Sequence, residues 1–223
     1  PNVLFIAVDD LRPTMGSYGD PYAVTPNMDR LASQGTTFMN AYCQQAVSNP
    51  SRASMLTGMR PDQIEVTDLN THFREKGPDV VTLPQLFKNN GDYVAGAGKI
   101  FHSGGKMRDD ISWTEQASAY DRREYILEKN ITPNAGKAAS VEKAYVADDV
   151  YPDGKIAEDA IGFLHKAAAS DQPFFLAVGF KKPHLLFCAP AKFWDIYDDS
   201  DFSTDYRAIQ SVSPVIAYHN STE

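Results

Sequence analysis

The chain has 223 residues, of which 43% are hydrophobic and 22% charged, a composition that excludes a largely disordered protein. Its formal net charge of −8, from 21 basic and 29 acidic residues, argues against a nucleic-acid-binding protein that neutralises phosphates. The two cysteines, Cys43 and Cys188, form no C-x-x-C pair, which disfavours a disulfide scaffold and a structural zinc site. No apolar stretch is long enough to cross a bilayer, so no membrane span is predicted.

The first predicted elements are a strand, a pair of acidic residues and a helix. Residues 3–8 form a continuous apolar run, which predicts a strand buried on both faces of a parallel sheet. Asp9 and Asp10 follow at once. Thr25 and Pro26 then supply an N-cap and a first-turn proline, so a helix is predicted from there to Gly35.

The most informative segment is residues 48–58, which reads S-x-P-S-R-x-x-x-L-T-G. Pro50 suits the first turn of a helix, so the segment predicts a helix that begins directly after Ser48 and ends at Gly58. The amide groups and the positive end of the dipole at a helix N-terminus favour an anion. Arg52, one turn into the helix, is expected to point back at residue 48 and stabilise charged oxygens.

The later elements continue the alternation of helices and strands. A helix is predicted from Thr82 to about Asn90, and a short strand over residues 93–97, followed by Lys99 and His102. From Ile156 a helix with one apolar face is predicted, and then a strand over residues 174–178. Residues 108–150 are polar and poorly periodic, which predicts a long insertion with no more than one helix.

This alternation predicts an α/β fold with a mostly parallel sheet and helices on both faces. In such sheets ligands bind outside the carboxyl ends of the strands, where functional residue types gather here: Asp9, Asp10, Lys99, His102, Lys182 and His184. Adjacent carboxylates repel unless a cation neutralises them, and oxygen ligands favour calcium or magnesium over zinc. Each of these residues alone could have an ordinary structural role: an aspartate caps a turn or is solvated, a lysine is solvated, and a histidine is packed.

The pattern at residues 48–58 resembles the signature of type I sulfatases, a family within the alkaline phosphatase superfamily. Further segments extend the resemblance, towards the iduronate-2-sulfatase branch, over most of the chain: residues 9–13, 44–48, 98–102 and 174–184. The resemblance implies an alkaline phosphatase-like fold and a periplasmic or secreted location. It also implies that the substrate is a sulfated sugar, here a 2-O-sulfated uronic acid of a glycosaminoglycan.

The same resemblance assigns the nucleophile and the metal site. Ser48 would be oxidised after translation to formylglycine, whose aldehyde hydrate attacks the sulfur of a sulfate ester. Because animal members have cysteine at this position, a serine implies the anaerobic type of maturation enzyme. Asp9, Asp10 and the modified residue 48 would bind a divalent metal, usually Ca2+, and Arg52 would help to activate the nucleophile.

The remaining roles are also carried over from the family. Lys99 would bind the sulfate group, and Lys182 would contact the sulfate or the sugar. His184 would donate a proton to the leaving alcohol, and His102 would help to release sulfate from the sulfated intermediate.

One part of the family pattern is missing from the sequence. The Asp-His-Gly segment that completes the metal site, and the lysine that follows it, do not occur in these 223 residues. We therefore expect residues 1–223 to be the N-terminal part of a longer catalytic domain, inactive without a C-terminal segment. Two alternatives stay open: a phosphoryl-transfer hydrolase that uses unmodified Ser48, and a noncatalytic sulfoglycan-binding fragment.

Overall fold

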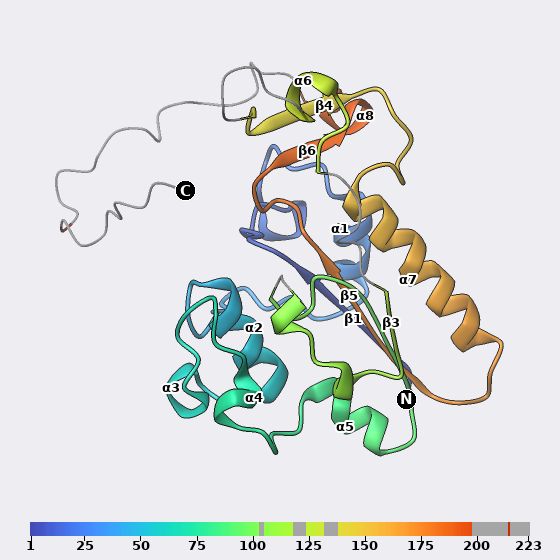
Figure 1. The fold of residues 1–223 in the computed structure, drawn as a ribbon. Helices are drawn as coiled ribbons and strands as arrows, with labels where there is room; N and C mark the ends of the chain where they lie inside the picture. The colour runs from blue at the N-terminus through green and yellow to red at the C-terminus, as the bar shows by residue number, and fades with distance from the viewer. Residues whose placement is uncertain (103–104, 118–123, 132–137, 198–213, 215–223) are drawn as a thin grey trace.

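The computed structural model describes residues 1–102, 105–117, 124–131, 138–197 and 214. Its centre is a four-stranded sheet in the order β1-β5-β2-β3, in which every neighbouring pair of strands is parallel (Figure 1). The bounds are β1 Val3–Val8, β2 Tyr93–Gly98, β3 Glu115–Ala117 and β5 Phe174–Phe180. The predicted parallel α/β architecture is confirmed.

Several helices cover one face of this sheet, at the lower left of Figure 1. They are α2 Ser48–Thr57, α3 Pro61–Ile64, α4 Phe73–Lys76 and α5 Leu83–Asn89. Leu56 of α2 and Phe73 of α4 are buried in one apolar cluster with Val94 and Phe175 of the sheet. The helix predicted from Thr82 is confirmed, because the hydroxyl of Thr82 accepts the N–H of Gln85 at 3.2 Å and caps α5.

The opposite face carries α7, Pro152–Ala168, and α1, Pro26–Ser33, which lie together at the right of the sheet in Figure 1. Both helices are confirmed from the sequence pattern. Ile156, Ala160 and Phe163 lie three or four residues apart on α7 and are buried against Leu176 and Val178 of β5. This packing fixes the N-terminal end of α7 beside the carboxyl end of β5.

Within residues 108–150 the structure has one strand in the main sheet and a small second layer. β3 belongs to the main sheet, while β4, Val141–Ala144, pairs in parallel with β6, Phe187–Pro190. Short helices flank this second sheet: α6 Glu128–Ile131 and α8 Ala191–Trp194. Single turns of 3-10 helix complete the described elements: η1 Gly16–Tyr18, η2 Gly105–Met107 and η3 Asp110–Ser112. In the part of the chain that the structure describes, no helix combines the length and apolarity needed to cross a membrane.

One prediction about the sheet was wrong in the described structure. The strand over residues 3–8 exists, but it is an edge strand that pairs only with β5, and it is not buried on both faces. Leu4 and Ile6 are 48% and 49% exposed. An apolar run identifies a strand but not its neighbours, and here β2 and β5, not β1, are the strands with both faces covered.

Candidate active site

The carboxyl ends of three strands place charged residues side by side at one edge of the sheet. Asp9 and Lys99 are the first residues beyond β1 and β2, and both strands pair with β5, which leads into Lys181. The backbone N–H of Asp9 donates to Phe180 at 3.1 Å, and that of Lys99 donates to Gly179 at 2.8 Å. The predicted gathering of functional groups at this edge therefore follows from the register of the sheet.

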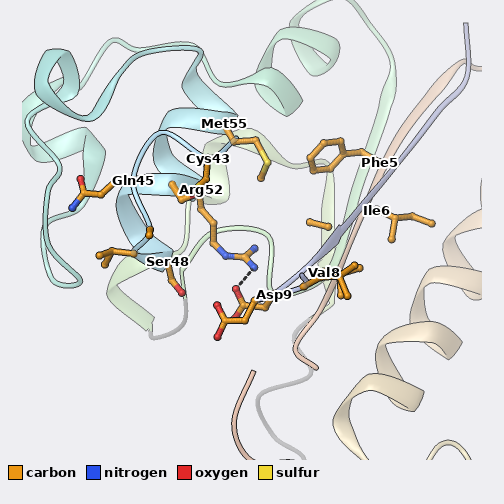
Figure 2. Close-up of a pocket in the computed structure, with 15 residues that line it drawn as sticks. Phe5, Ile6, Val8, Asp9, Cys43, Gln45, Ser48, Arg52 and Met55 are labelled. Atoms are coloured by element: carbon orange, nitrogen blue, oxygen red, sulfur yellow. Dashed lines mark hydrogen bonds and ion pairs between the residues drawn. The ribbon is translucent and has the colours of Figure 1, made fainter. Parts of the chain in front are cut away.

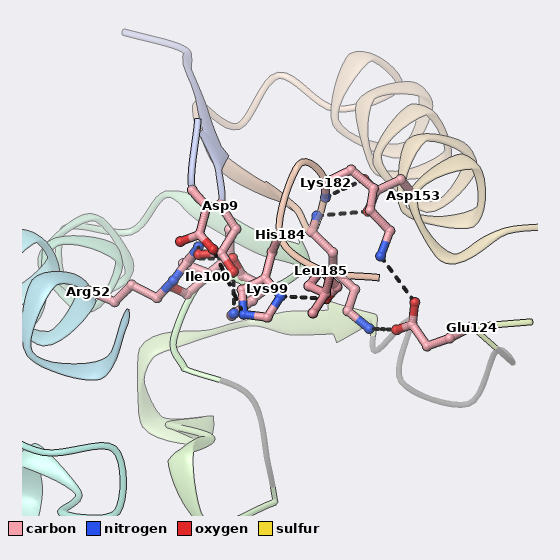
Figure 3. A network of polar contacts seen from close by, with 11 residues as sticks. Asp9, Arg52, Lys99, Ile100, Glu124, Asp153, Lys182, His184 and Leu185 are labelled. Atoms are coloured by element: carbon pink, nitrogen blue, oxygen red, sulfur yellow. Dashed lines mark hydrogen bonds and ion pairs between the residues drawn. The ribbon is translucent and has the colours of Figure 1, made fainter. Parts of the chain in front are cut away.

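Asp9 is the buried centre of this edge. One carboxylate oxygen accepts a hydrogen bond from Nη2 of Arg52 at 2.6 Å, and the other accepts one from Nζ of Lys99 (Figure 3). The three residues are only 4%, 6% and 3% exposed. Burial alone would raise the pKa of Asp9, but the hydrogen bonds from Lys99 and Arg52 outweigh it and hold this pKa below its usual value.

Arg52 also fastens α2 to the end of β2. Its Nη1 donates to the backbone carbonyls of Lys99 at 2.6 Å and Ile100 at 2.9 Å. The sequence predicts that Arg52 points back at residue 48, whereas these hydrogen bonds go to Asp9 and to backbone. The planar guanidinium serves several acceptors at once, which a lysine ammonium at this position does less well.

Ser48 stands at the N-terminus of α2, as the sequence predicts. The helix begins at Ser48 itself, its N-cap residue Val47 provides no side-chain hydrogen bond, and it ends at Gly58, which has φ 71°. The buried side chain of Asn49 donates to the carbonyls of Asp68 at 2.9 Å and Thr71 at 2.8 Å, which anchors this end of the helix.

A cavity of about 430 Å³ joins these groups. Ser48, Arg52, Asp9 and Asp10 all line it, and Figure 2 shows the Ser48 side chain directed to the same place as those of Arg52 and Asp9. The N-terminus of α2 and the guanidinium of Arg52 bring positive charge to this cavity, and Asp9 and Asp10 bring negative charge.

Asp10 and His184 lie where solvent reaches the site. Asp10 has φ 56°, a left-handed conformation that is rare outside glycine and that occurs at functional sites. Its Oδ2 lies 3.9 Å from Nε2 of His184, and the two side chains are 57% and 43% exposed. Nδ1 of His184 lies 2.6 Å from the carbonyl of Leu185. A proton on Nδ1 makes this hydrogen bond and leaves Nε2 directed towards Asp10.

These residues offer donors for a divalent cation. Asp9, Asp10 and His184 each present one ligand atom, and the three atoms lie within 4.8 Å of one another. Carboxylate oxygens suit a hard cation such as Ca2+, which takes roughly six to eight oxygen ligands. The charges of Asp9, Asp10, Arg52 and Lys99 cancel, so a bound anion would need further positive charge. The donor set fits a hard divalent cation but does not complete its coordination.

Lys99 and His102 follow the end of β2, and burial shifts the pKa values of both. Burial lowers the pKa of Lys99, although its contact with Asp9 acts in the opposite direction. Burial, and then the charges of Lys99 and Arg52, also lower the pKa of His102, so a neutral imidazole is favoured there. Nδ1 of His102 is buried and has no hydrogen-bond partner among the described residues.

Lys182 is separated from the other predicted site residues. Its Nζ lies 3.3 Å from Oε2 of Glu124, and it lines a neighbouring groove instead of the cavity beside Ser48. Glu124 pairs with Lys181 as well, and the carboxylate of Asp153 accepts the backbone N–H groups of both lysines. Sequence reasoning missed Glu124 and Asp153, which no local pattern marks.

Comparison with known proteins assigns the family. The family model described as Sulfatase matches residues 1–221. The chain belongs to the sulfatase family. The sulfatase is 39% identical over 225 residues to iduronate 2-sulfatase of Mus musculus, an alignment that covers 96% of this chain and 41% of the mouse protein. It therefore spans less than half the length of that relative.

Solved structures agree with this assignment. A structure described as a 2-O GAG sulfatase superposes with a TM-score of 0.59 at 29% identity, over 82% of this sulfatase and 35% of that chain. The phosphonate monoester hydrolase of Agrobacterium radiobacter gives a TM-score of 0.70 at 20% identity, over 93% of this sulfatase and 46% of that chain, which shows a shared fold alone. The fold is the alkaline phosphatase-like fold that the resemblance implies.

Proposed function

We propose that this chain is the N-terminal part of a sulfuric ester hydrolase that removes sulfate from a sulfated sugar through formylglycine made from Ser48. One observation carries the proposal: Ser48, Arg52 and Asp9 converge on one cavity at the carboxyl edge of the sheet. Membership of the sulfatase family supports it. The resemblance to longer relatives supports a further C-terminal segment that completes the metal site.

Position 48 provides the nucleophile in this proposal. A hydrated aldehyde there has one hydroxyl to attack sulfur and a second whose deprotonation allows sulfate to leave, whereas plain serine has only one. Asp9, Asp10 and residue 48 would hold a divalent cation, proposed to be Ca2+, which supplies positive charge next to the sulfate oxygens. Arg52 lines the cavity and Lys99 pairs with the same carboxylate of Asp9, so both bring positive charge to this edge of the sheet.

Two histidines move protons. His184 is half-exposed beside Asp10, so its Nε2 is accessible to the leaving sugar oxygen. When both ring nitrogens carry a proton, Nδ1 keeps its hydrogen bond to Leu185 and Nε2 would pass its proton to that oxygen. His102 is buried next to Lys99 with a lowered pKa, so it is available as a neutral base that accepts the proton during sulfate release. Burial therefore favours the neutral imidazole at His102.

The proposed substrate is a 2-O-sulfated uronic acid at the end of a glycosaminoglycan fragment. The similarity to a relative named iduronate 2-sulfatase and to a structure described as a 2-O GAG sulfatase supports this class. Lys182 is proposed to contact the sugar or its sulfate, which requires Glu124 to release it. A periplasmic or secreted location is proposed on the same family grounds.

The full-length protein tests the proposal when it is produced with and without an anaerobic-type maturation enzyme. We expect mass spectrometry of the peptide containing residue 48 to show loss of two hydrogens only with that enzyme. We also expect sulfate release from 2-O-sulfated uronides by the converted protein, and none by a Ser48→Ala variant. Turnover of phosphate esters by unconverted protein would instead favour the phosphoryl-transfer alternative, and sugar binding without turnover would favour the noncatalytic one.

A further inference from the structure

The turn that carries His184 begins where β5 ends. β5 stops at Phe180, and the first two residues beyond it, Lys181 and Lys182, no longer have strand partners for their backbone N–H groups. The N–H of His184 donates to the carbonyl of Lys181 at 3.0 Å, which closes the turn. The position of the imidazole therefore depends on what holds residues 181 and 182.

Asp153 holds both of them. Its Oδ1 accepts the N–H of Lys181 at 2.8 Å and its Oδ2 accepts the N–H of Lys182 at 2.9 Å (Figure 3). Each carboxylate oxygen thus satisfies one of the two amides at the strand end. Burial raises the pKa of Asp153, and the two N–H groups act against this rise. The two backbone hydrogen bonds thus favour the ionised form of this half-buried side chain.

The carboxylate of Asp153 is carried by a helix that is packed firmly against the sheet. Asp153 lies in the first turn of α7, whose apolar side is buried against the sheet through Ile156 and Ala160. The next residue, Gly154, packs so closely that a Cβ there would lie 1.7 Å from the carbonyl oxygen of Asp148. This contact leaves the start of α7 little freedom to shift, so the helix provides the fixed geometry that a supporting residue needs.

A second acidic residue, Glu124, binds the side chains of the two lysines in the turn. Glu124 pairs with Nζ of Lys181 and lies 3.3 Å from Nζ of Lys182. Backbone and side chains of residues 181 and 182 are therefore bound by different carboxylates. Two residues farther on, His184 presents Nε2 at 3.9 Å from Asp10.

We propose that Asp153 is a positioning residue that fixes the turn after β5 so that Nε2 of His184 faces the reacting ester. This inference rests on the proposed function, in which His184 protonates the leaving sugar oxygen. Asp153 acts on the turn through its hydrogen bonds to the backbone N–H groups of Lys181 and Lys182. Its loss should therefore affect the step that needs the His184 proton more than steps that do not.

The test compares two leaving groups in the full-length, converted protein. The hydroxyl oxygen of a sugar is a poor leaving group unless it is protonated, whereas the acidic phenol of an aryl sulfate leaves without a proton. We expect Asp153→Ala to lower kcat for the sulfated sugar about 10- to 100-fold, since small misplacement of a reacting group costs about that much. KM for the sulfated sugar should change little. Turnover of the aryl sulfate should fall less than about threefold, because its leaving group does not need the displaced imidazole.

Three further variants make the comparison specific. Asp159→Ala removes an acid six residues farther along the same helix, where it pairs with Lys155 at 2.6 Å, so both activities should stay at the wild-type level. Asp153→Asn keeps one carbonyl acceptor and should show an intermediate loss. His184→Ala should show the same selective loss for the sugar, and adding Asp153→Ala to it should cause no further loss.

Different results overturn different statements. Asp153→Ala that lowers turnover of the sugar and of the aryl sulfate equally would show a merely structural role. The same holds if the losses of Asp153→Ala and His184→Ala multiply in the double variant. Either result would overturn the inference alone. If Asp153→Ala does not fold, the same two criteria apply to Asp153→Asn. Wild-type protein without sugar sulfatase activity, or His184→Ala that slows both substrates equally, would overturn the proposed function and the inference with it.

Discussion

At the residue scale, the site depends on a buried carboxylate shared by two cations. Asp9 contacts Arg52 and Lys99, and all three side chains are nearly inaccessible to solvent. Breaking a buried ion pair by removing one partner is costly because the other charge stays buried without compensation. The stability of the domain and the charge balance of the site are therefore coupled through Asp9.

We predict that Asp9→Asn lowers the free energy of unfolding of the full-length protein by about 3–5 kcal/mol, because Arg52 and Lys99 lose their common counter-ion. Urea unfolding in the presence of a chelator measures this without a contribution from bound metal. Asp62→Asn is the matched control, since Asp62 pairs with Arg60 while both side chains are more than half-exposed. The control should change stability by less than about 0.5 kcal/mol, and equal effects of both variants would contradict the prediction.

At the element scale, two glycines at the strand ends allow β2 and β5 to lie close enough to form the site. A Cβ at Gly179 would lie 2.0 Å from the carbonyl oxygen of Lys99, and one at Gly98 would lie 2.3 Å from that of Gly179. Gly98 also has φ 76°, a conformation that side chains disfavour. The backbone that positions Lys99 thus requires the absence of side chains at these two places.

Gly179→Ala should accordingly destabilise the protein by about 1–3 kcal/mol, the usual cost of forcing extra atoms into a packed interior. Gly162→Ala on the exposed side of α7 provides a contrast, since a Cβ there meets nothing within 4 Å. That substitution should stabilise the helix by about 0.5–1 kcal/mol. Thermal unfolding of the two variants and the wild type measures both effects. Gly179→Ala should lower the unfolding midpoint and Gly162→Ala should raise it, so shifts in the same direction would contradict the prediction.

The smaller sheet has its own buried acid. Glu142 on β4 is 2% exposed and accepts four hydrogen bonds. The donors are the backbone N–H groups of Ile126 at 2.7 Å and Leu127 at 3.2 Å, Nδ2 of Asn130 at 2.7 Å and the hydroxyl of Tyr151 at 2.6 Å. Burial would raise the pKa of Glu142, but these hydrogen bonds, that of Tyr151 first, hold it below its ordinary value of 4.5. The carboxylate therefore joins β4, α6 and the start of α7.

A lowered pKa gives this acid a pH-dependent effect on stability. The contribution of Glu142 is fully present above about pH 4.5, its value in the unfolded chain, and is lost as the pH falls through the lower folded pKa. We predict that Glu142→Gln costs about 2–3 kcal/mol at pH 7, because an amide donor replaces an acceptor among four donors. It should also flatten the acid limb of a plot of stability against pH.

Urea unfolding between about pH 3 and pH 7, the range on either side of the ordinary carboxyl pKa, measures both effects. Glu65→Gln serves as the control, because Glu65 pairs with Lys76 at the surface and its side chain is 68% exposed. An unchanged acid limb in Glu142→Gln would show that other carboxylates govern the pH dependence.

Local signals in the sequence predicted the elements well, whereas contacts between distant segments were not predictable. Capping residues such as Thr82 and the apolar faces of the helices act over one or two turns, so α5 and α7 were correctly placed. The gathering of Asp9 and Lys99 followed from parallel topology. The role of Asp153 depends on hydrogen bonds to residues 28 and 29 positions away, for which no periodicity exists. Strand β3 escaped notice because it has only three residues.

At the scale of the whole molecule, β1 and α1 border a wide apolar groove. Its volume is about 800 Å³, and Ile6, Leu31 and Phe38 line it. These side chains are 49%, 68% and 72% exposed. Soluble proteins rarely leave such patches or an apolar edge strand open to water. We expect the proposed C-terminal segment to cover the apolar part of this groove, since the mouse relative has more than twice the matched length.

We therefore predict that residues 1–223 alone bind a fluorescent hydrophobic dye strongly, and that the proposed longer protein binds it weakly. Phe38→Ser should reduce dye binding by the shorter chain, because it removes a large apolar side chain from the groove. Tyr145→Ser is the control: Tyr145 is 86% exposed but lies outside the groove lining, so its removal should leave dye binding unchanged. In hydrogen exchange, the free-edge amides of β1 should be protected only in the longer protein, since pairing slows their exchange. Equal dye binding and equal β1 exchange in the two proteins would mean that the additional segment packs elsewhere.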